Sequence, residues 1–283
     1  MDKLYLLPYD QYSGNCDFEC NDGFEVTELL GGNYSTFESA KSAIRWIANH
    51  LNLQREDEVY ISTTTESSFV STCVSATLFN YCRLSRILSE STKLIFVIHE
   101  FGYPNQRLPS LIEFGRKHNI PVIEDVAHSL NSDWKGIRLG SSGDYAIHSL
   151  PKCFPTTSGG ILYCKDQSLS ESRNAEAEDS IKKWGGYIEF FKKRKIEIAN
   201  RYKKLLGYRE EIFNLSEGLD PFVFGFKTDQ SEEINWELEA AGFQVGRTYV
   251  SGFVLLPVNP FASDSLIDDC VKIILTVESK RYD

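Results

Sequence analysis

The chain has 283 residues, of which 42% are hydrophobic and 25% are charged, values usual for a globular protein that buries a sizeable core. Its formal net charge of −10 argues against broad binding to nucleic acid or to anionic membranes, because both need positive charge. This length fits one large α/β domain, alone or with a smaller appendage.

The N-terminal segment lacks the apolar core of a signal peptide because Pro8, Tyr9 and Asp10 interrupt it, and no apolar run reaches membrane-spanning length. The seven cysteines are scattered without a CxxC pair. Cys16 and Cys20 could face each other across a turn, but no second pair completes a zinc set. We therefore expect a cytoplasmic protein with reduced, mostly structural thiols and with no membrane segment and no metal site.

The first predicted element is a helix that begins at Ser35 or Thr36, either of which can cap it, and continues at helical spacing to Leu51. Glu58–Thr63 then has the composition of a short buried strand. The Ser/Thr/Val-rich stretch Ser67–Leu78 is ambiguous between helix and strand.

A βαβ unit follows. Lys93–His99 is a buried strand, Leu108–Lys117 an amphipathic helix, and Pro121–Glu124 a second strand that stops at Asp125. Strand, helix and strand at this spacing predict parallel pairing with a right-handed crossover. Ligands of open α/β sheets bind at the carboxyl ends of the strands, and Asp125 and His99 both occupy such positions.

The remaining chain divides into a lysine-bearing loop, a linker and a small lobe. Gly143–Ser149 and Gly159–Cys164 form a hairpin-like pair around Lys152, residues 166–183 form a polar linker or surface segment, and Tyr187–Leu206 is one long helix. The small α/β lobe then consists of a strand at Phe222–Phe226, a helix at Glu232–Ala241, a strand at Phe253–Val258 and a helix at Ser265–Val277. We expect a large domain over residues 1–183, followed by the long helix and the small lobe over residues 184–283.

The stretch from Val122 to Gly160 carries the side chains that a pyridoxal phosphate (PLP) enzyme needs. Asp125 ends a strand, His128 follows three residues later, and Lys152 lies in a loop rich in Ser, Pro, Thr and Gly. A lysine amine can form a Schiff base with the cofactor aldehyde, and a carboxylate can keep the ring nitrogen protonated. The alternatives are a solvated surface lysine, an aspartate that caps a helix and a core histidine, but three such residues together favour the cofactor site.

Four segments match a known family in order and spacing: KLIFVIHEFGYP at Lys93–Pro104, VIEDVAHSL at Val122–Leu130, KGIRLGSSGDYAIHSL at Lys135–Leu150, and KCFPTTSGGILY at Lys152–Tyr163. With them the chain resembles the DegT/DnrJ/EryC1/StrS family of PLP-dependent sugar aminotransferases, of fold type I. The resemblance implies an α/β fold with a mostly parallel sheet flanked by helices and a small C-terminal α/β lobe.

Carried over residue by residue, the resemblance implies that Lys152 is the catalytic Schiff-base lysine and that Asp125 is the partner of the pyridine nitrogen. His128 occupies the position, usually Gln or His, that lies near the ring hydroxyl or the ring face of the cofactor.

The same resemblance assigns the remaining cofactor contacts. Ser149 is the candidate for the serine that binds the cofactor phosphate, and the backbone amides of Ser39 and Ala40 fall at a helix start that also cradles phosphate. Phe69 is the candidate for the aromatic ring that stacks on the cofactor.

The sequence also departs from the family pattern. Only two residues separate Ser149 from Lys152 where many members have four, so Ile147 could instead stand at the phosphate position. Ala40 replaces the usual glycine. The Gly-Tyr-Asn-x-Arg segment that reaches the neighbouring subunit's phosphate has no counterpart, and only Gly185–Gly186–Tyr187 comes near it.

The resemblance implies transfer of an amino group from an amino-acid donor such as glutamate to a nucleotide-linked keto-sugar, by a homodimer. The departures keep a second reading open, a degenerate member that serves as a sugar-binding or partner protein in polysaccharide biosynthesis. A third reading keeps PLP but performs dehydration or isomerisation.

Overall fold

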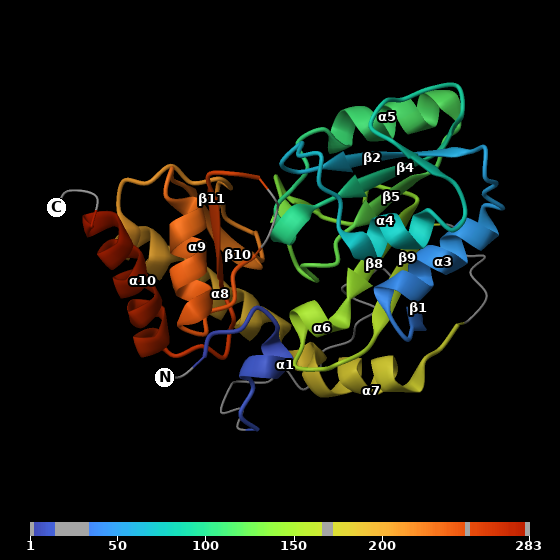
Figure 1. Ribbon diagram of the computed structural model, residues 1–283. Helices are drawn as coiled ribbons and strands as arrows, with labels where there is room; N and C mark the ends of the chain where they lie inside the picture. Colours follow the sequence, from blue (N-terminus) through green and yellow to red (C-terminus); the bar gives the residue numbers. More distant parts are fainter. Residues whose placement is uncertain (1–2, 15–33, 166–171, 247–249, 281–283) are drawn as a thin grey trace.

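The chain, in a computed structural model, is described for residues 3–14, 34–165, 172–246 and 250–280. Within these ranges the main sheet has seven strands in the order β1-β9-β8-β5-β4-β2-β3, most of them labelled in Figure 1. Two-stranded sheets pair β10 with β11 and β6 with β7. The strands are β1 (Tyr34–Phe37), β2 (Glu58–Thr63), β3 (Arg83–Ser85), β4 (Thr92–Ile98), β5 (Val122–Asp125), β6 (Asp133–Trp134), β7 (Ile137–Arg138), β8 (Tyr145–Ser149), β9 (Gly160–Cys164), β10 (Val223–Lys227) and β11 (Phe253–Pro257).

The helices flank the main sheet and build the C-terminal lobe. They are α1 (Pro8–Gln11), α3 (Ala40–His50), α4 (Thr72–Leu78), η1 (Glu100–Gly102), α5 (Leu108–His118), α6 (Leu150–Cys153), α7 (Ala175–Trp184), η2 (Gly185–Tyr187), α8 (Ile188–Leu206), α9 (Ser231–Ala240) and α10 (Asp264–Ser279).

Five adjacent strands of the main sheet, β3, β2, β4, β5 and β8, run parallel. β9 is antiparallel to β8, and β1 is antiparallel to β9. The α/β fold class with a mostly parallel sheet flanked by helices is therefore confirmed. Because β4, β5 and β8 lie side by side, the residues at their carboxyl ends meet at one edge of the sheet.

The two faces of the sheet bury alternate residues of each strand, as a pleated strand requires. Along β4, Leu94 and Phe96 enter the core beneath α3 and α4, whereas Ile95 and Val97 enter the core beneath α5. Figure 1 shows α5 on the opposite side of the sheet from α3 and α4. This two-sided burial explains why the strand appears in the sequence as one continuous apolar run.

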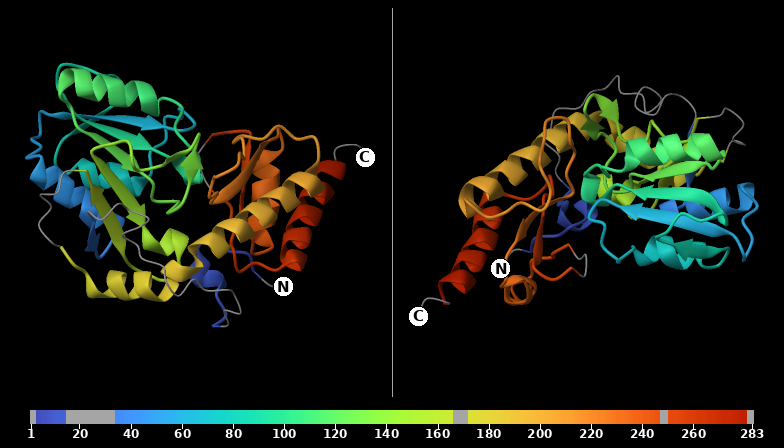
Figure 2. Two further views of the ribbon diagram at one scale, coloured as in Figure 1. Left: turned by 180° about the vertical axis from the view of Figure 1, so that it is seen from behind. Right: turned by 90° about the horizontal axis from the view of Figure 1, so that it is seen from above.

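The C-terminal lobe packs α8, α9 and α10 around the β10–β11 ladder, beside the main sheet (Figure 2). The division at residues 183 and 184 stays a proposal. The seven-stranded sheet and the β10–β11 sheet fall on either side of that boundary, but Leu4 pairs with Phe243 and is fully buried in the core of the C-terminal lobe. The N-terminal segment therefore contributes to both parts.

Two predicted elements are wrong. Ser35 and Thr36 do not cap a helix: they lie in β1, and Ser39 caps α3 by accepting a hydrogen bond from the Ser42 amide. The segment 166–183, predicted as a polar linker or surface segment, contains α7 within its described part, and Ile181 of that helix is buried.

Across the ranges that the structure describes, no helix has the length and apolarity needed to cross a membrane, and no cluster of three or more metal-ligating side chains occurs. Cys16 and Cys20 lie outside these ranges.

Candidate functional site

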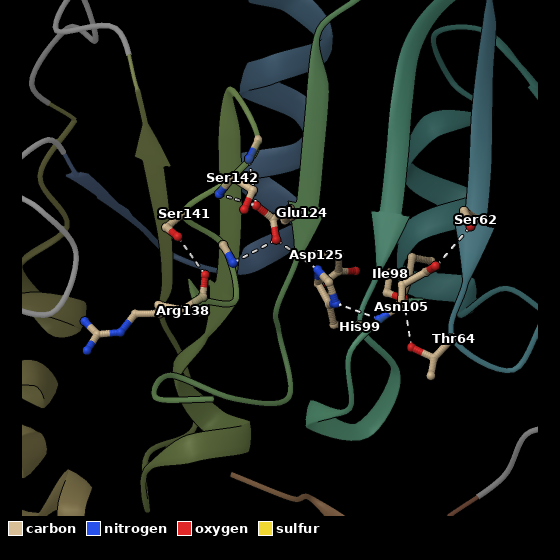
Figure 3. Close-up of polar contacts among 12 residues, drawn as sticks. Ser62, Thr64, Ile98, His99, Asn105, Glu124, Asp125, Arg138, Ser141 and Ser142 are labelled. Carbon is tan, nitrogen blue, oxygen red and sulfur yellow. Dashed lines mark hydrogen bonds and ion pairs between the residues drawn. The ribbon is translucent and has the colours of Figure 1, made fainter. Parts of the chain in front are cut away.

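Asp125 lies at the carboxyl end of β5, in the middle of the sheet edge where the site forms (Figure 3). The side chain is buried, and its Oδ1 accepts a hydrogen bond of 3.0 Å from the Ala127 amide. Burial raises the pKa of the Asp125 carboxyl, while the positive charge of Lys152 and the Ala127 bond act to lower it. Burial and these two interactions therefore act in opposite directions on the charge of the Asp125 carboxyl.

Glu124, the preceding residue, anchors this strand end from the other face of the sheet (Figure 3). Its fully buried carboxylate accepts hydrogen bonds from His99 Nε2 at 3.0 Å and from the amides of Gly140, Ser142 and Gly143 at 2.7–2.9 Å. Burial acts to raise the pKa of the Glu124 carboxyl, but these bonds outweigh it and lower the pKa. Glu124 is thus a satisfied buried anion that fixes the backbone next to the site.

His99, which the sequence places at a strand end, has its proton position set by its neighbours. Its Nδ1 accepts the Asn105 amide at 3.0 Å, so the other nitrogen, Nε2, carries the hydrogen that Glu124 accepts. Asn105 continues the network by donating to Ser62 Oγ at 3.0 Å (Figure 3).

His128 lies between two aromatic rings and faces Lys152. Its ring centroid is 5.1 Å from that of Phe101 and 4.9 Å from that of Phe222. The Phe101 amide donates to His128 Nδ1 at 3.3 Å, and His128 Nε2 lies 3.1 Å from Lys152 Nζ. Burial lowers the pKa of His128 well below its usual value, and the charges of Lys152 and Lys195 lower it further.

Lys152 is carried by α6, a single helical turn that begins where β8 ends. Burial lowers the pKa of its ammonium group, whereas Asp125 acts in the opposite direction. The structure thus brings together Lys152, His128 and Asp125, three of the residues that the sequence selected.

Ser39 and Ala40 reach the same neighbourhood through the α3 N-terminus. Ser39 forms a β-bridge with Gly159, and the Gly159 carbonyl accepts the Leu150 amide, at the start of α6. A Cβ at Gly160 would overlap the Ala40 nitrogen and would lie 2.7 Å from the Ser39 carbonyl oxygen. Only glycine allows this approach, which seats the helix N-terminus against the lysine turn.

The two candidates for the phosphate serine differ in position. Ile147 is fully buried in the core beneath α3 and α4, so its position offers no group for phosphate. Ser149 pairs with Gly160 at the strand end and is half-buried. Ser149 therefore remains the candidate.

Gly185–Gly186–Tyr187, the segment nearest to the family's Gly-Tyr-Asn-x-Arg pattern, form η2, and Tyr187 packs with Phe191 in the core beside α8.

Phe69 lies half-buried in the loop between β2 and α4. Cys73, in the first turn of α4, is close enough for its charge to act on the pKa of Lys152. The loop therefore leads toward the site, and the stacking role of Phe69 stays a prediction.

Sequence reasoning missed the partners that hold His128. Phe101 and Phe222 are 121 positions apart, and no local pattern joins them, although the Phe222 amide donates to the Phe101 carbonyl at 2.8 Å. It also missed Lys195, which pairs with Asp220 at 2.9 Å while both are buried. A signal existed for Lys195, because it lies at helical spacing on the apolar side of α8.

A separate cleft of about 730 Å³ opens between the main sheet and the C-terminal lobe, with Thr65, Tyr103 and Phe213 in its lining. The Tyr103 and Phe213 rings stack at 4.5 Å, and Phe101 contacts both Phe213 and His128. Phe101 therefore separates the wall of this cleft from the lysine site.

Comparison with known proteins agrees with the resemblance inferred from the sequence. Residues 66–189 match the DegT/DnrJ/EryC1/StrS aminotransferase family. The chain is 35% identical over 86 residues to a UDP-4-amino-4-deoxy-L-arabinose–oxoglutarate aminotransferase of Shewanella sediminis, which is 30% of this chain and 22% of that protein. It is 28% identical over 144 residues to a UDP-4-amino-4,6-dideoxy-N-acetyl-beta-L-altrosamine transaminase of Campylobacter jejuni, 45% of this chain and 38% of that protein. The matches thus span well under half of these curated relatives.

Solved structures show the same fold over most of the chain. The aminotransferase TlmJ from Streptoalloteichus hindustanus superposes with a TM-score of 0.78 at 19% identity, covering 91% of this chain and 89% of that one. A putative sugar aminotransferase from Streptococcus pneumoniae in its PMP form gives a TM-score of 0.74 at 16% identity, covering 94% and 92%. The fold expected from the sequence is therefore confirmed.

Proposed function

We propose that the chain is a PLP-dependent aminotransferase acting on a keto-sugar, because residues 66–189 match the DegT/DnrJ/EryC1/StrS aminotransferase family. The observation that carries the proposal is the placement of Lys152 Nζ 3.1 Å from His128, at the sheet edge that Asp125 also occupies. A lysine amine and a buried carboxylate at the carboxyl ends of parallel strands are the groups that this cofactor requires.

The residues present fit PLP. Lys152 offers an amine whose pKa burial lowers, and Asp125 offers a buried carboxylate. The close approach of Gly160 to Ser39 and Ala40 places a helix N-terminus beside the lysine turn, where backbone N–H groups and the helix dipole favour a phosphate. We propose that Ser149 adds its hydroxyl there and that Phe69 covers the ring.

When bound, PLP supplies an aldehyde for the lysine amine and a protonated ring that accepts the electron pair of a substrate α-carbon. Asp125 holds a proton on the ring nitrogen by its negative charge. Lys152 Nζ, as a neutral amine, takes the proton from the α-carbon of the substrate and later returns it. His128 positions Lys152 through the contact between its Nε2 and the lysine Nζ.

We further propose a nucleotide-linked keto-sugar as the acceptor and an amino acid as the donor, because relatives are named as transaminases or aminotransferases of UDP-linked amino sugars. We propose that the protein acts as a homodimer. Light scattering coupled to size-exclusion chromatography should give twice the mass of the chain, and a monomer at micromolar concentration would oppose this part.

The test is a single half reaction. Purified protein is loaded with PLP, cleared of excess cofactor and mixed with L-glutamate. The amount of 2-oxoglutarate formed is then compared with the amount of PLP-loaded active sites. One equivalent per site supports the transaminase, with K152A as the inactive control. PLP that binds but yields no 2-oxoglutarate with any of the common amino acids favours dehydration or isomerisation. Failure to bind PLP favours the degenerate member that binds a sugar or a partner protein.

A further inference from the structure

The tautomer of His128 follows from one contact. The Phe101 amide donates to His128 Nδ1 at 3.3 Å. A backbone N–H only donates, so Nδ1 presents its lone pair there. The proton of a neutral imidazole must then sit on Nε2.

The surroundings of His128 keep the ring neutral. It is packed between Phe101 and Phe222, and among the described residues its two ring nitrogens contact the Phe101 amide and Lys152 Nζ rather than a carboxylate. Burial disfavours a positive charge on the ring, and the nearby cation Lys195 opposes that charge as well. The ring therefore carries one proton, on Nε2.

That proton is directed at Lys152 Nζ, 3.1 Å away. An ammonium group has three donors and no acceptor, so an ammonium facing an Nε2–H would place two donors head to head. Only the neutral amine has a lone pair to accept the bond. We propose that His128, as its Nε2–H tautomer, donates to Lys152 and so holds this lysine as the neutral amine before any ligand arrives.

Burial and the carboxylate of Asp125 act on Lys152 in opposite directions. Burial works with His128 in favour of the amine, while Asp125 acts toward the ammonium. Within the part of the chain that the structure describes, His128 is the side chain that forms a hydrogen bond with the Lys152 nitrogen, and its donor favours the amine. The purpose of this arrangement rests on the proposed function, since an amine attacks an aldehyde and an ammonium does not.

The experiment measures the protonation of Lys152 without using catalysis. The full chain, freed of cofactor with hydroxylamine, is labelled with trace acetic anhydride over a range of pH, and the Lys152 peptide is quantified by mass spectrometry. The exposed Lys93 serves as the internal reference. In the wild type, Lys152 should react at a clearly lower pH than Lys93.

Two variants separate the hydrogen bond from packing. In His128→Gln the amide oxygen accepts from Phe101 and the NH₂ donates to Lys152, so labelling should match the wild type. His128→Met offers no donor, and the labelled fraction of Lys152 at pH 7 should fall about two- to tenfold, the equivalent of one hydrogen bond. A Met variant that labels like the wild type overturns the proposal.

A second measurement needs no variant. Long-range ¹H–¹⁵N correlation on histidine-labelled protein reports which ring nitrogen of His128 is protonated. The Nε2–H pattern supports the proposal, and an Nδ1–H or doubly protonated ring contradicts it. These results are independent of the half reaction. A protonated Lys152 with normal glutamate turnover would contradict this inference and leave the proposed function intact. A neutral Lys152 with no PLP binding would contradict the proposed function and leave this inference intact.

Discussion

Asp125 allows charge to be separated from shape. Asp125→Asn keeps an oxygen for the Ala127 amide but loses the negative charge that would hold the cofactor ring protonated. We expect PLP still to bind stoichiometrically while the glutamate half reaction slows about 100-fold or more. Stability should be unchanged or higher, because burial disfavours the charged carboxyl and raises its pKa. A half reaction at the wild-type rate would contradict the assigned role.

His148 makes the fold sensitive to acid. It is buried and contacts the Ser129 carbonyl through Nδ1, and burial lowers its pKa from 6.5 to about 4. The unfolded chain therefore binds a proton at a higher pH than the folded chain. Stability should fall as the pH drops from 6.5 toward 4, by roughly 3 kcal/mol if each pKa unit counts for about 1.4 kcal/mol.

Urea unfolding at a series of pH values measures this loss. His148→Gln, which keeps a donor for the Ser129 carbonyl but does not titrate, should flatten the profile in that range. His128, whose pKa burial also lowers, adds to the slope in both proteins. Identical slopes for the two proteins would show that His148 has no part in the acid sensitivity.

At the level of single residues, the sequence predicted the side chains of the candidate cofactor site but not the residues that hold them in place. Lys152, Asp125 and His128 could be selected because their types and order are unusual together. Their partners could not, since Phe222 reaches His128 only through the fold of the C-terminal lobe. The roles of Ser149 and Phe69 remain predictions.

Among the elements, the contact between the α3 N-terminus and β9 depends on one glycine. In Gly160→Ala the added Cβ overlaps Ser39 and Ala40 backbone atoms, so the two segments must separate. We expect a loss of about 1–3 kcal/mol in unfolding free energy together with weaker PLP binding, measured by denaturant titration and by fluorescence titration.

Gly136→Ala is the matched control. Gly136 has a φ of 77° but open space around its Cβ position, so the substitution strains only its own backbone. It should cost about 1 kcal/mol and leave PLP affinity unchanged. Equal effects of the two variants on PLP affinity would argue against a role for this contact in cofactor binding.

Helices and strands with a strong apolar pattern could be predicted from the sequence. A helix whose apolar residues are separated by many charged residues could not. β2 was predicted with its observed ends, and α5 with one residue less, because an uninterrupted apolar run and a clear amphipathic pattern marked them. The helix α7 was missed although Ala177, Ile181 and Trp184 follow helical spacing, since glutamate and lysine fill the positions between them. Ser35–Phe37 of β1 was taken into a helix because the pairing of this strand with β9 is non-local.

At the scale of the whole molecule, a buried ion pair joins the C-terminal lobe to the site. Lys195 of α8 binds Asp220 at 2.9 Å, and Asp220 also accepts from Ser129 Oγ at 3.2 Å, one residue from His128. Lys195→Met leaves the buried Asp220 carboxylate without its cation and should cost about 3 kcal/mol or more.

A double variant shows whether the pair acts as a unit. Lys195→Met combined with Asp220→Asn removes both charges and should recover more than 1 kcal/mol relative to Lys195→Met alone, by denaturant titration. Losses that simply add would mean that the two side chains do not stabilise each other.

The central claim is that Lys152 is the residue that attaches the cofactor. The most direct measurement incubates the full chain with PLP, reduces it with borohydride and locates the phosphopyridoxyl group by peptide mass mapping, with K152A in parallel. The prediction is one equivalent of label, found on the peptide that contains Lys152 and lost in K152A. Label spread over surface lysines at equal levels in both proteins, or no label at saturating PLP, would contradict it.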